Sequence, residues 1–212
     1  MRIIEVKSTK DRLFEEALEI YDASFPRNER HARSVIEERL DRKLYRLFIG
    51  QKDGQTVLMA LFYPLRGSPF VLFDYMAVAE GHRGIGLGTQ FLRGLSKTIK
   101  LGKRHLVLEV EDPRFGDNKD QRRKRIELYK RQGAKMLKGV RYIMPSLFGP
   151  TPTEMVLFIW PGPKAGKMPG STVKKVVLQV YRELYGRDDT DALLNSFLKD
   201  IPEVVELIDG RS

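Results

Sequence analysis

The segment Phe73-Asp-Tyr-Met-Ala-Val-Ala-Glu-Gly-His-Arg-Gly-Ile-Gly-Leu-Gly-Thr-Gln-Phe-Leu92 decides how the rest of the chain is interpreted. An apolar strand runs into a glycine-rich turn, and the turn opens a helix. Gly84, Gly86 and Gly88 allow the backbone to approach a ligand closely. The start of a helix also offers unpaired N–H groups and the positive end of the helix dipole. The pattern therefore favours an anion-binding turn, although a strand-to-helix turn without a ligand has the same glycine spacing.

The same spacing excludes two common nucleotide-binding motifs. The third glycine of Gly84-x-Gly86-x-Gly88 comes one position too early for the dinucleotide-binding pattern G-x-G-x-x-G. A P-loop needs Gly-Lys-Ser/Thr, and here Gly88 is followed directly by Thr89. If this turn binds an anion, it therefore does so as neither a dinucleotide-binding motif nor a P-loop.

Two motifs in order along the chain resemble those of the GNAT superfamily of N-acetyltransferases. Arg83-Gly-Ile-Gly-Leu-Gly88 resembles the family's Arg/Gln-x-x-Gly-x-Gly/Ala signature, and Leu128-Tyr-Lys-Arg-Gln-Gly-Ala134 is similar to its Leu-Tyr-x-x-x-Gly-Phe element. The resemblance covers roughly residues 2 to 160. It implies an α/β fold with a mixed, mostly antiparallel central sheet flanked by helices. It also implies acetyl-CoA as the co-substrate and no metal.

The resemblance further implies that two neighbouring segments contact the coenzyme. The backbone of Met76, Ala77 and Val78 would pair with the pantetheine arm and hydrogen-bond the thioester oxygen. The turn would hold the pyrophosphate with Arg83, Gly84, Ile85, Gly86, Leu87, Gly88 and Thr89.

The chain departs from the commonest family pattern before the second motif. Many relatives have Asn and Ala where this chain has Arg122 and Arg125. Together with Leu108 to Pro113 and Tyr142 to Pro145, this segment resembles a bacterial branch whose substrates are mostly unassigned. A ribosomal-protein or peptide acceptor therefore does not follow from the resemblance.

The implied reaction is direct attack of a neutral amine on the thioester in a ternary complex. The chain has no cysteine, so no thiol could carry the acyl group. Tyr129 is the candidate acid for the departing thiolate, because a phenol can protonate a group of comparable or lower basicity. The alternative is a tyrosine that packs its helix against the sheet.

Several carboxylates are candidates for the base, and the sequence leaves the choice open. Asp74 and Glu109 are the leading ones, and Glu111 follows Glu109 on the same face of its strand. A half-buried carboxylate there would have a raised pKa. Ion pairs to the arginines of the next helix, or a water chain that replaces a dedicated base, are the alternatives.

The acceptor is expected to be a small-molecule or peptide amine. Residues 25–30 lie between the first two helices, which border the acceptor groove in this family, so Glu29 would bind a cationic amine or else be an ordinary loop charge. A protein N-terminal or lysine acetyltransferase is an alternative, as is a non-catalytic module that binds acyl-CoA or nucleic acid.

The composition of the chain bears on which ligands and partners are expected. Of 212 residues, 42% are hydrophobic and 31% are charged, which is typical of a globular chain. The three histidines, His31, His82 and His105, lack metal-ligand spacing. The net charge of +10 suits a polyanion such as coenzyme A, but no basic stripe is interleaved with aromatic residues, so nucleic acid is not favoured. We expect no signal peptide, no membrane partner and a cytoplasmic location.

Hydrophobic periodicity predicts alternating strands and helices followed by a helical extension. Strands are expected at residues 2–6, 45–51, 55–63, 70–79, 105–111, 134–137 and 154–160. Helices are expected at residues 11–24, 32–43, 86–100 and 120–132, and amphipathic ones at 172–184 and 192–201. We therefore expect an acetyltransferase domain over residues 1–162, and a linker with helical extension over 163–212. The extension would pack on the core or on a second subunit, which leaves a homodimer open.

Overall fold

The computed structural model describes residues 1–98 and 104–209, and the chain divides into two compact units. Unit 1 comprises Met1–Pro64 and the segment that begins at Phe73 and ends before Arg104. Unit 2 comprises Leu65–Leu72 and the chain from Arg104 onward. Residues 163–209 therefore belong to the same unit as residues 104–162. The domain boundary expected between residues 162 and 163 stays a prediction.

Unit 1 is built on a sheet with the strand order β1-β2-β3-β4. The strands are β1 (Arg2–Val6), β2 (Arg46–Lys52), β3 (Gln55–Pro64) and β4 (Phe70–Val78), whose first three residues belong to unit 2. The pairs β1–β2 and β2–β3 are antiparallel. The β2–β3 hairpin turns at Asp53 and Gly54, whose φ angles of 51° and 79° are those of a left-handed two-residue turn.

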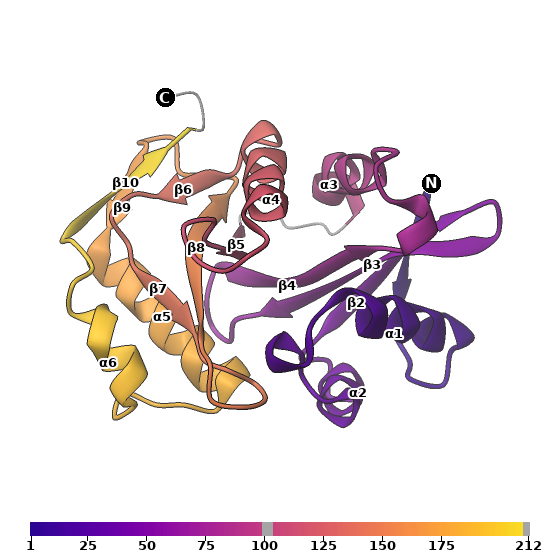
Figure 1. Ribbon diagram of the computed structural model, residues 1–212, viewed down its shortest axis with the longest axis horizontal. Coiled ribbons are helices and arrows are strands. Elements are labelled where there is room, and N and C mark those ends of the chain that lie inside the picture. The colour runs from indigo at the N-terminus through magenta and orange to yellow at the C-terminus, as the bar shows by residue number, and fades with distance from the viewer. Residues whose placement is uncertain (99–103, 210–212) are drawn as a thin grey trace. The chain divides into compact units, whose positions relative to one another are not determined.

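Helices cover both faces of this sheet (Figure 1). Helices α1 (Arg12–Ser24) and α2 (Arg33–Asp41) lie on one face and α3 (Leu87–Thr98) on the other, with short 3₁₀ turns η1 (Arg27–Glu29) and η2 (Glu80–His82). Asp11 caps α1 by accepting a hydrogen bond from the Leu13 N–H at 3.0 Å. The expected end of the third helix at Lys100 lies outside the described residues.

Unit 2 is built on strands in the order β5-β8-β6-β10-β9, with β7 also paired to β8. They are β5 (His105–Glu111), β6 (Lys135–Leu137), β7 (Tyr142–Met144), β8 (Thr153–Trp160), β9 (Lys167–Pro169) and β10 (Val204–Ile208). The pairs β5–β8, β6–β8, β7–β8, β6–β10 and β9–β10 are all antiparallel. Each of these strands therefore runs opposite to its neighbour.

Helices α4 (Lys119–Arg131) and α5 (Gly170–Tyr185) cover opposite faces of the unit 2 strands (Figure 1). Val156 lines a cavity with residues of α4, whereas its neighbour Leu157 lines a small gap with residues of α5. Successive side chains of a strand point to opposite faces, so the two helices lie on different sides of β8. The short helix α6 (Ala192–Leu198) lies near α5 and β7.

The structure of the C-terminal extension (residues 163–209) differs from the sequence predictions in three places. Residues 167–169 and 204–208, expected outside any strand, form β9 and β10, and β10 inserts between β6 and β9. The short strand β7 was also not expected. The last helix ends at Leu198 and not at residue 201. Strands β7, β9 and β10 are only three to five residues long, and the partners of β9 and β10 are distant in sequence, so local periodicity carries little signal for them.

The apolar side chains of α5 form the stripe expected from its sequence, and they are buried: Val173, Val176, Val177, Val180, Tyr181 and Leu184. Gly170, at the helix start, leaves no room for a side chain, because a Cβ would lie 1.8 Å from the Pro202 carbonyl oxygen. Its N–H donates to the Glu203 carbonyl at 2.6 Å. Within the described residues, no helix is long and apolar enough to cross a membrane.

Candidate active site

The glycine-rich turn connects the end of β4 to the start of α3 in unit 1. Gly84 and Gly86 have φ angles of 81° and 83°, in the left-handed region that side chains rarely adopt. A Cβ at either position would meet no atom within 4 Å, so the space beside the turn is open. Glycine is therefore required here by backbone conformation, and the exposed backbone can approach a ligand.

Arg83 ties this turn to the strand and helix before it. Its Nε donates to the Val78 carbonyl at 3.1 Å, and its Nη2 donates to the Ser24 hydroxyl at 3.2 Å. Along the end of β4, Ala77 is buried while Met76 and Val78 are half-buried. All the residues predicted to bind coenzyme thus lie on one continuous strand-turn-helix segment, where Ile85 is 59% exposed and Leu87 is buried.

Glu109 is held by two tyrosines in unit 2. Its register partner across to β8 is Leu157, so its side chain lies on the face that α5 covers. The hydroxyl of Tyr142, on β7, donates to Oε1 through a short hydrogen bond. The hydroxyl of Tyr185, the last residue of α5, lies 3.0 Å from Oε1 and 2.8 Å from Oε2. The carboxylate is therefore fixed by phenols from two elements.

Burial raises the pKa of Glu109 to about 7, although the hydrogen bonds from Tyr142 and Tyr185 act to lower it. Loss of water disfavours the charged form, and hydrogen bonds donated to the carboxylate favour it. A carboxyl group with a pKa near 7 can exist in either protonation state at neutral pH. This is the property that a general base needs.

Tyr129 lies on α4, so it belongs to the helix on the other face of the same strands. Its side chain is 8% exposed, and burial raises the pKa of the phenol while the nearby Arg125 lowers it. The helix ends just beyond it, with Gly133 at a φ of 87° and the Ala134 N–H donating to the Tyr129 carbonyl at 3.0 Å. The phenol thus stays protonated at neutral pH and is available as a proton donor.

Asp74, the other predicted base, belongs to a polar network in unit 1. The Tyr45 hydroxyl donates to Oδ2 of Asp74 through a short hydrogen bond. Arg39 Nη1 donates to the same Tyr45 oxygen at 3.0 Å and lies 3.1 Å from the His31 Nε2. Asp74 is therefore linked through one phenol to a guanidinium.

His31 in this network is buried and 8% exposed. Burial and, to a smaller extent, the positive charge of Arg39 together lower its pKa to about 3. The imidazole is therefore neutral at physiological pH. We assign Nε2 as the acceptor of the Arg39 hydrogen bond, because the guanidinium can only donate.

Glu29 and Glu111, the remaining carboxylates singled out from the sequence, have different surroundings. Glu29 is half-buried at the end of η1, where its backbone carbonyl accepts a hydrogen bond of 2.8 Å from Tyr75. Glu111 forms ion pairs with Arg122 at 3.0 Å and with Arg125. Glu111 thus makes the ion pairs to the next helix that were the alternative to a base role.

Sequence reasoning did not identify Tyr142 and Tyr185 as site residues. They lie 33 and 76 residues from Glu109, and no local pattern connects them to it. The available signal was indirect: a glutamate on an otherwise apolar strand needs a buried hydrogen-bond donor. That requirement does not say which of the tyrosines in the chain supplies it.

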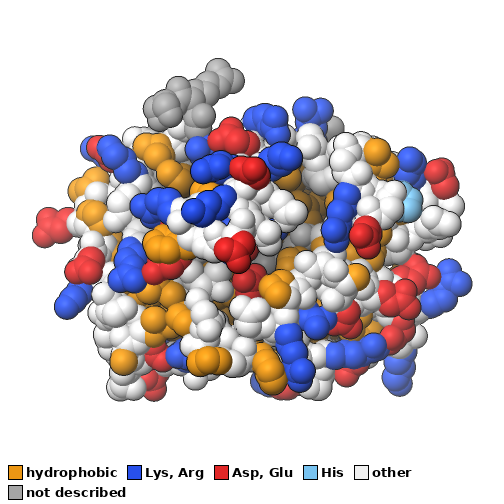
Figure 2. All heavy atoms as spheres, viewed as in Figure 1, with side chains coloured by type: hydrophobic (Ala, Val, Ile, Leu, Met, Phe, Trp, Pro, Cys, Tyr) orange, Lys and Arg blue, Asp and Glu red, His pale blue; other side chains and the backbone are white. Residues whose placement is uncertain are grey.

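A separate cavity of about 790 Å³ lies over the α4 face of unit 2. Apolar side chains such as Ile126 and Leu137 form part of its lining, and basic side chains gather around α4 on the face seen in Figure 2. Every lysine and arginine of the lining is matched by a carboxylate, in the pairs Arg114–Asp112, Arg123–Asp120, Lys130–Glu127, Lys138–Glu206 and Arg141–Glu154. The charge pattern therefore selects no class of ligand.

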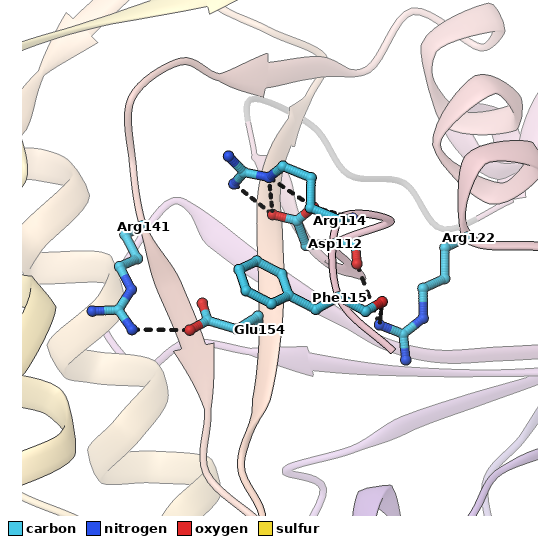
Figure 3. Close-up of polar contacts among 6 residues, drawn as sticks. All are labelled: Asp112, Arg114, Phe115, Arg122, Arg141 and Glu154. Atoms are coloured by element: carbon cyan, nitrogen blue, oxygen red, sulfur yellow. Dashed lines mark hydrogen bonds and ion pairs between the residues drawn. The ribbon is translucent and has the colours of Figure 1, made fainter. Parts of the chain in front are cut away.

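The loop before α4 forms one wall of this cavity (Figure 3). Arg114 donates to both oxygens of Asp112, which is 3% exposed, and Figure 3 shows the Phe115 ring directed toward the strand that carries Glu154. Arg122 Nη1 donates to the carbonyls of Asp112 and Phe115 at 3.2 and 2.8 Å. Arg122, which departs from the commonest family pattern, therefore braces this loop.

A model of the Acetyltransferase (GNAT) family matches residues 11–134. Since that match covers more than half of the chain, the chain belongs to the Acetyltransferase (GNAT) family. Its structure has the GNAT fold, with mostly antiparallel strands flanked by helices. Family membership supports an acyltransferase activity. Within the described residues, no group of three or more histidine, aspartate or glutamate side chains could hold a metal ion.

Similar proteins extend this picture over the length of the chain. YjbC of Bacillus subtilis (strain 168), named as an acetyltransferase, is 26% identical over 196 residues, which is 92% of each protein. A GNAT-family structure from Bacteroides thetaiotaomicron is 20% identical with a TM-score of 0.74, covering 89% of this chain and 100% of that one. A 99-residue match to an uncharacterised Dictyostelium discoideum protein is 29% identical and spans 46% of this chain but 22% of that relative.

Some of the similar solved structures contain a coenzyme ligand, and one from Bacillus subtilis is in complex with CoA. A GNAT family acetyltransferase from Elizabethkingia anophelis, with acetyl-CoA bound, is 16% identical with a TM-score of 0.52. The match covers 74% of this chain and 95% of the Elizabethkingia anophelis protein. At these identities, the solved structures establish the fold alone.

Proposed function

We propose that the chain is an N-acetyltransferase that transfers the acetyl group of acetyl-CoA to an amine by direct attack, with Glu109 as the general base. The observation that carries this proposal is the half-buried carboxylate of Glu109, held by two phenols and with a pKa of about 7. At neutral pH an appreciable fraction is unprotonated, and this fraction can take a proton from the attacking amine.

Tyr129 serves as the general acid in this proposal. Its pKa is raised by burial, so the phenol carries its proton at neutral pH. As the amine nitrogen bonds to the carbonyl carbon, the carbon–sulfur bond breaks and the thiolate takes the phenolic proton. Glu109 receives the proton of the amine, and solvent exchange restores both groups. Nitrogen thus replaces sulfur on the acetyl carbon without a covalent enzyme intermediate.

The glycine-rich turn is the part of unit 1 that suits the coenzyme. Its positive-φ glycines leave the backbone exposed and the space beside it open, and the N-terminus of α3 favours negative charge. We assign the pyrophosphate to residues 83–89, and the thioester oxygen to the backbone of residues 76–78. Acetyl-CoA supplies the activated acyl group, and the related protein from Elizabethkingia anophelis has acetyl-CoA bound.

The acceptor is proposed as a small-molecule or peptide amine, with Glu29 as the candidate contact for a cationic one. Asp74 has a structural role in this proposal, because its donor Tyr45 is also held by Arg39. Acetylation of a protein N-terminus or lysine is the alternative reaction, and acyl-CoA binding without turnover is the alternative class. The cytoplasmic location and the homodimer stay predictions.

A two-part experiment tests the proposal. The purified protein is incubated with acetyl-CoA and a panel of alkylamines, polyamines, amino acids and peptides that contain lysine or a free N-terminus, and released CoA is measured. At least one acceptor should support turnover that Glu109→Gln lowers by about 10²–10⁴-fold. The matched control is Glu154→Gln, the same substitution on β8, where the carboxylate instead pairs with Arg141. Equal turnover in the two variants would refute the role of Glu109.

Coenzyme binding is tested separately by calorimetry with acetyl-CoA. Gly86→Val should weaken binding at least tenfold, since the turn can no longer adopt its open left-handed conformation. Gly149→Val is the control, because Gly149 has a φ of 88° and equally open surroundings in a different loop. Wild-type affinity in folded Gly86→Val protein would remove the turn from the coenzyme site.

A further inference from the structure

The C-terminal helix α5 brings Tyr185 to Glu109 from 76 residues away in the sequence. Its hydroxyl reaches both carboxylate oxygens, at 3.0 Å from Oε1 and 2.8 Å from Oε2. Tyr142 donates to Oε1. Within the described residues, loss of the Tyr185 hydroxyl would therefore leave Oε2 without a hydrogen-bond donor, whereas loss of the Tyr142 hydroxyl would leave Tyr185 as a donor to both oxygens.

Packing of the extension fixes the position of Tyr185. The helix ends at this residue, where Gly186 adopts a φ of 64° and its N–H donates to the Tyr181 carbonyl. The Tyr185 ring lies edge-on to the Tyr181 ring, with ring centroids 5.6 Å apart. The Tyr181 ring in turn packs against the Phe197 ring of α6, with ring centroids 6.0 Å apart. The Tyr181 hydroxyl donates to the Ile143 carbonyl on β7. The phenol is therefore held by helices α5 and α6 together.

The groups that face Glu109 from the neighbouring elements are phenols. Strand β7 contributes Tyr142, and α5 contributes Tyr185 and Tyr181. Burial raises the pKa values of Tyr142 and Tyr181, and the charge of Glu109 adds to the rise. On β5 itself, Glu111 is paired with Arg122 and Arg125. Arg187 and Asp191, which precede α6, pair with each other at 2.9 Å. Among the described residues, the hydrogen bonds to Glu109 thus come from neutral donors.

We propose that Tyr185 is a positioning residue for the general base, and that its hydroxyl orients the Glu109 carboxylate and stabilises its unprotonated form. The inference rests on the proposed role of Glu109 in proton transfer. Residues 163–209 are then part of the active-site machinery of this protein, because Tyr185 supplies a donor that reaches both carboxylate oxygens. The extension acts on the chemistry through Glu109 and needs no contact with either substrate.

The first test measures the protonation of Glu109 without any acceptor. Infrared difference spectra between each protein and its own Glu109→Gln variant report the carboxyl band of Glu109 as a function of pH. Tyr185→Phe in the full chain should raise the pKa of Glu109 by about one unit, because a hydrogen bond to the charged form is lost. Tyr181→Phe is the matched control, since this hydroxyl donates to a backbone carbonyl and its loss should leave the pKa of Glu109 unchanged.

The second test uses the best amine from the acceptor panel. In Tyr185→Phe, the ascending limb of the pH profile of kcat/KM should move to higher pH, with about a fivefold loss at pH 7 that disappears well above pH 8. Acetyl-CoA affinity should stay at the wild-type value. A merely structural role would lower activity equally at all pH values.

The outcomes distinguish the positioning role of Tyr185 from the base role of Glu109. If Glu109→Gln is impaired but folded Tyr185→Phe keeps the wild-type pKa of Glu109, the inference about Tyr185 is wrong and the base assignment stands. If Glu109→Gln turns over like wild type, the base assignment fails and the positioning role fails with it. Circular dichroism and the melting temperature establish that each variant is folded.

Discussion

Asp74 and Glu109 are both half-buried carboxylates on strands, and each accepts a short hydrogen bond from a tyrosine, yet their settings differ. In unit 1, the tyrosine that holds Asp74 is itself held by Arg39, so a cation is one hydrogen bond away. In unit 2, two neutral phenols donate to Glu109, and burial raises its pKa to about 7. Whether a carboxylate on a strand is a candidate base therefore depends on the groups that bind its hydrogen-bond donors, as well as on its own burial.

The largest expected effect is on turnover. Glu109→Gln should lower kcat by about 10²–10⁴-fold, because a group that accepts a proton in the transition state is lost. Asp74→Asn should lower it by less than about tenfold, since asparagine can still accept the Tyr45 hydrogen bond. Turnover is measured as CoA release with the best acceptor. If Asp74→Asn were the more damaged enzyme, the roles of the two carboxylates would be reversed.

The next effect concerns stability in acid and arises from His31. Its pKa is about 3 in the folded protein against an ordinary value of 6.5, so between these values the unfolded chain binds a proton that the folded chain does not. This contribution is fully present above pH 6.5 and is lost as the pH falls toward 3, by up to about 1.4 kcal/mol per pH unit. Urea unfolding of wild type and His31→Gln from pH 4 to 8 measures it. The difference between the two proteins should shrink or reverse as the pH falls, and a constant difference would contradict this.

Glu109 should have the opposite dependence over a narrower window. Its pKa is about 7 when folded against an ordinary 4.5, so the folded state binds the extra proton. Its contribution is fully present below pH 4.5 and is lost as the pH rises toward 7, amounting to no more than about 3 kcal/mol. Unfolding of wild type relative to Glu109→Gln between pH 4 and 8 measures the effect. Equal pH slopes for the two proteins would show that Glu109 titrates normally.

The smallest effect distinguishes the tyrosines. Tyr45→Phe removes a donor of Asp74 and an acceptor of Arg39, which should cost about 1–3 kcal/mol of unfolding free energy while kcat/KM keeps its pH profile. Tyr142→Phe should cost a similar free energy and move the ascending limb of that profile to higher pH. The measurements are urea unfolding and the pH dependence of CoA release. A shifted limb in Tyr45→Phe would remove the distinction between the two carboxylates.

Much of unit 1 could be predicted from the sequence because its signals are local. The turn at Asp53 and Gly54 follows from residue types that tolerate positive φ, and both residues have it. The glycine-rich turn has positive φ at Gly84 and Gly86 for the same reason. In unit 2, strand β5 was also predicted with its observed bounds, His105–Glu111, since its apolar side chains and its glutamates are close together in the chain.

The rest depended on contacts between residues distant in sequence. Strand β10 pairs Leu207 with Leu137, and β9 lies in a segment whose prolines and glycines resemble a linker. Glu109 could be found by alternation along its strand, whereas Tyr142 and Tyr185 could not, because only the folded chain brings them to it. The roles of Tyr129, Asp74 and Glu29 stay predictions.

The place of β10 between β6 and β9 has a consequence for biosynthesis. A nascent chain leaves the ribosome with its amino end first. One edge of β6 therefore stays unpaired until residues 204–208 have been synthesised and released. Until then the chain presents an open strand edge of the kind that pairs with other chains. A messenger truncated within the codons of β10 (Val204–Ile208) would therefore yield a product prone to aggregate, even though every residue proposed for proton transfer had already been translated.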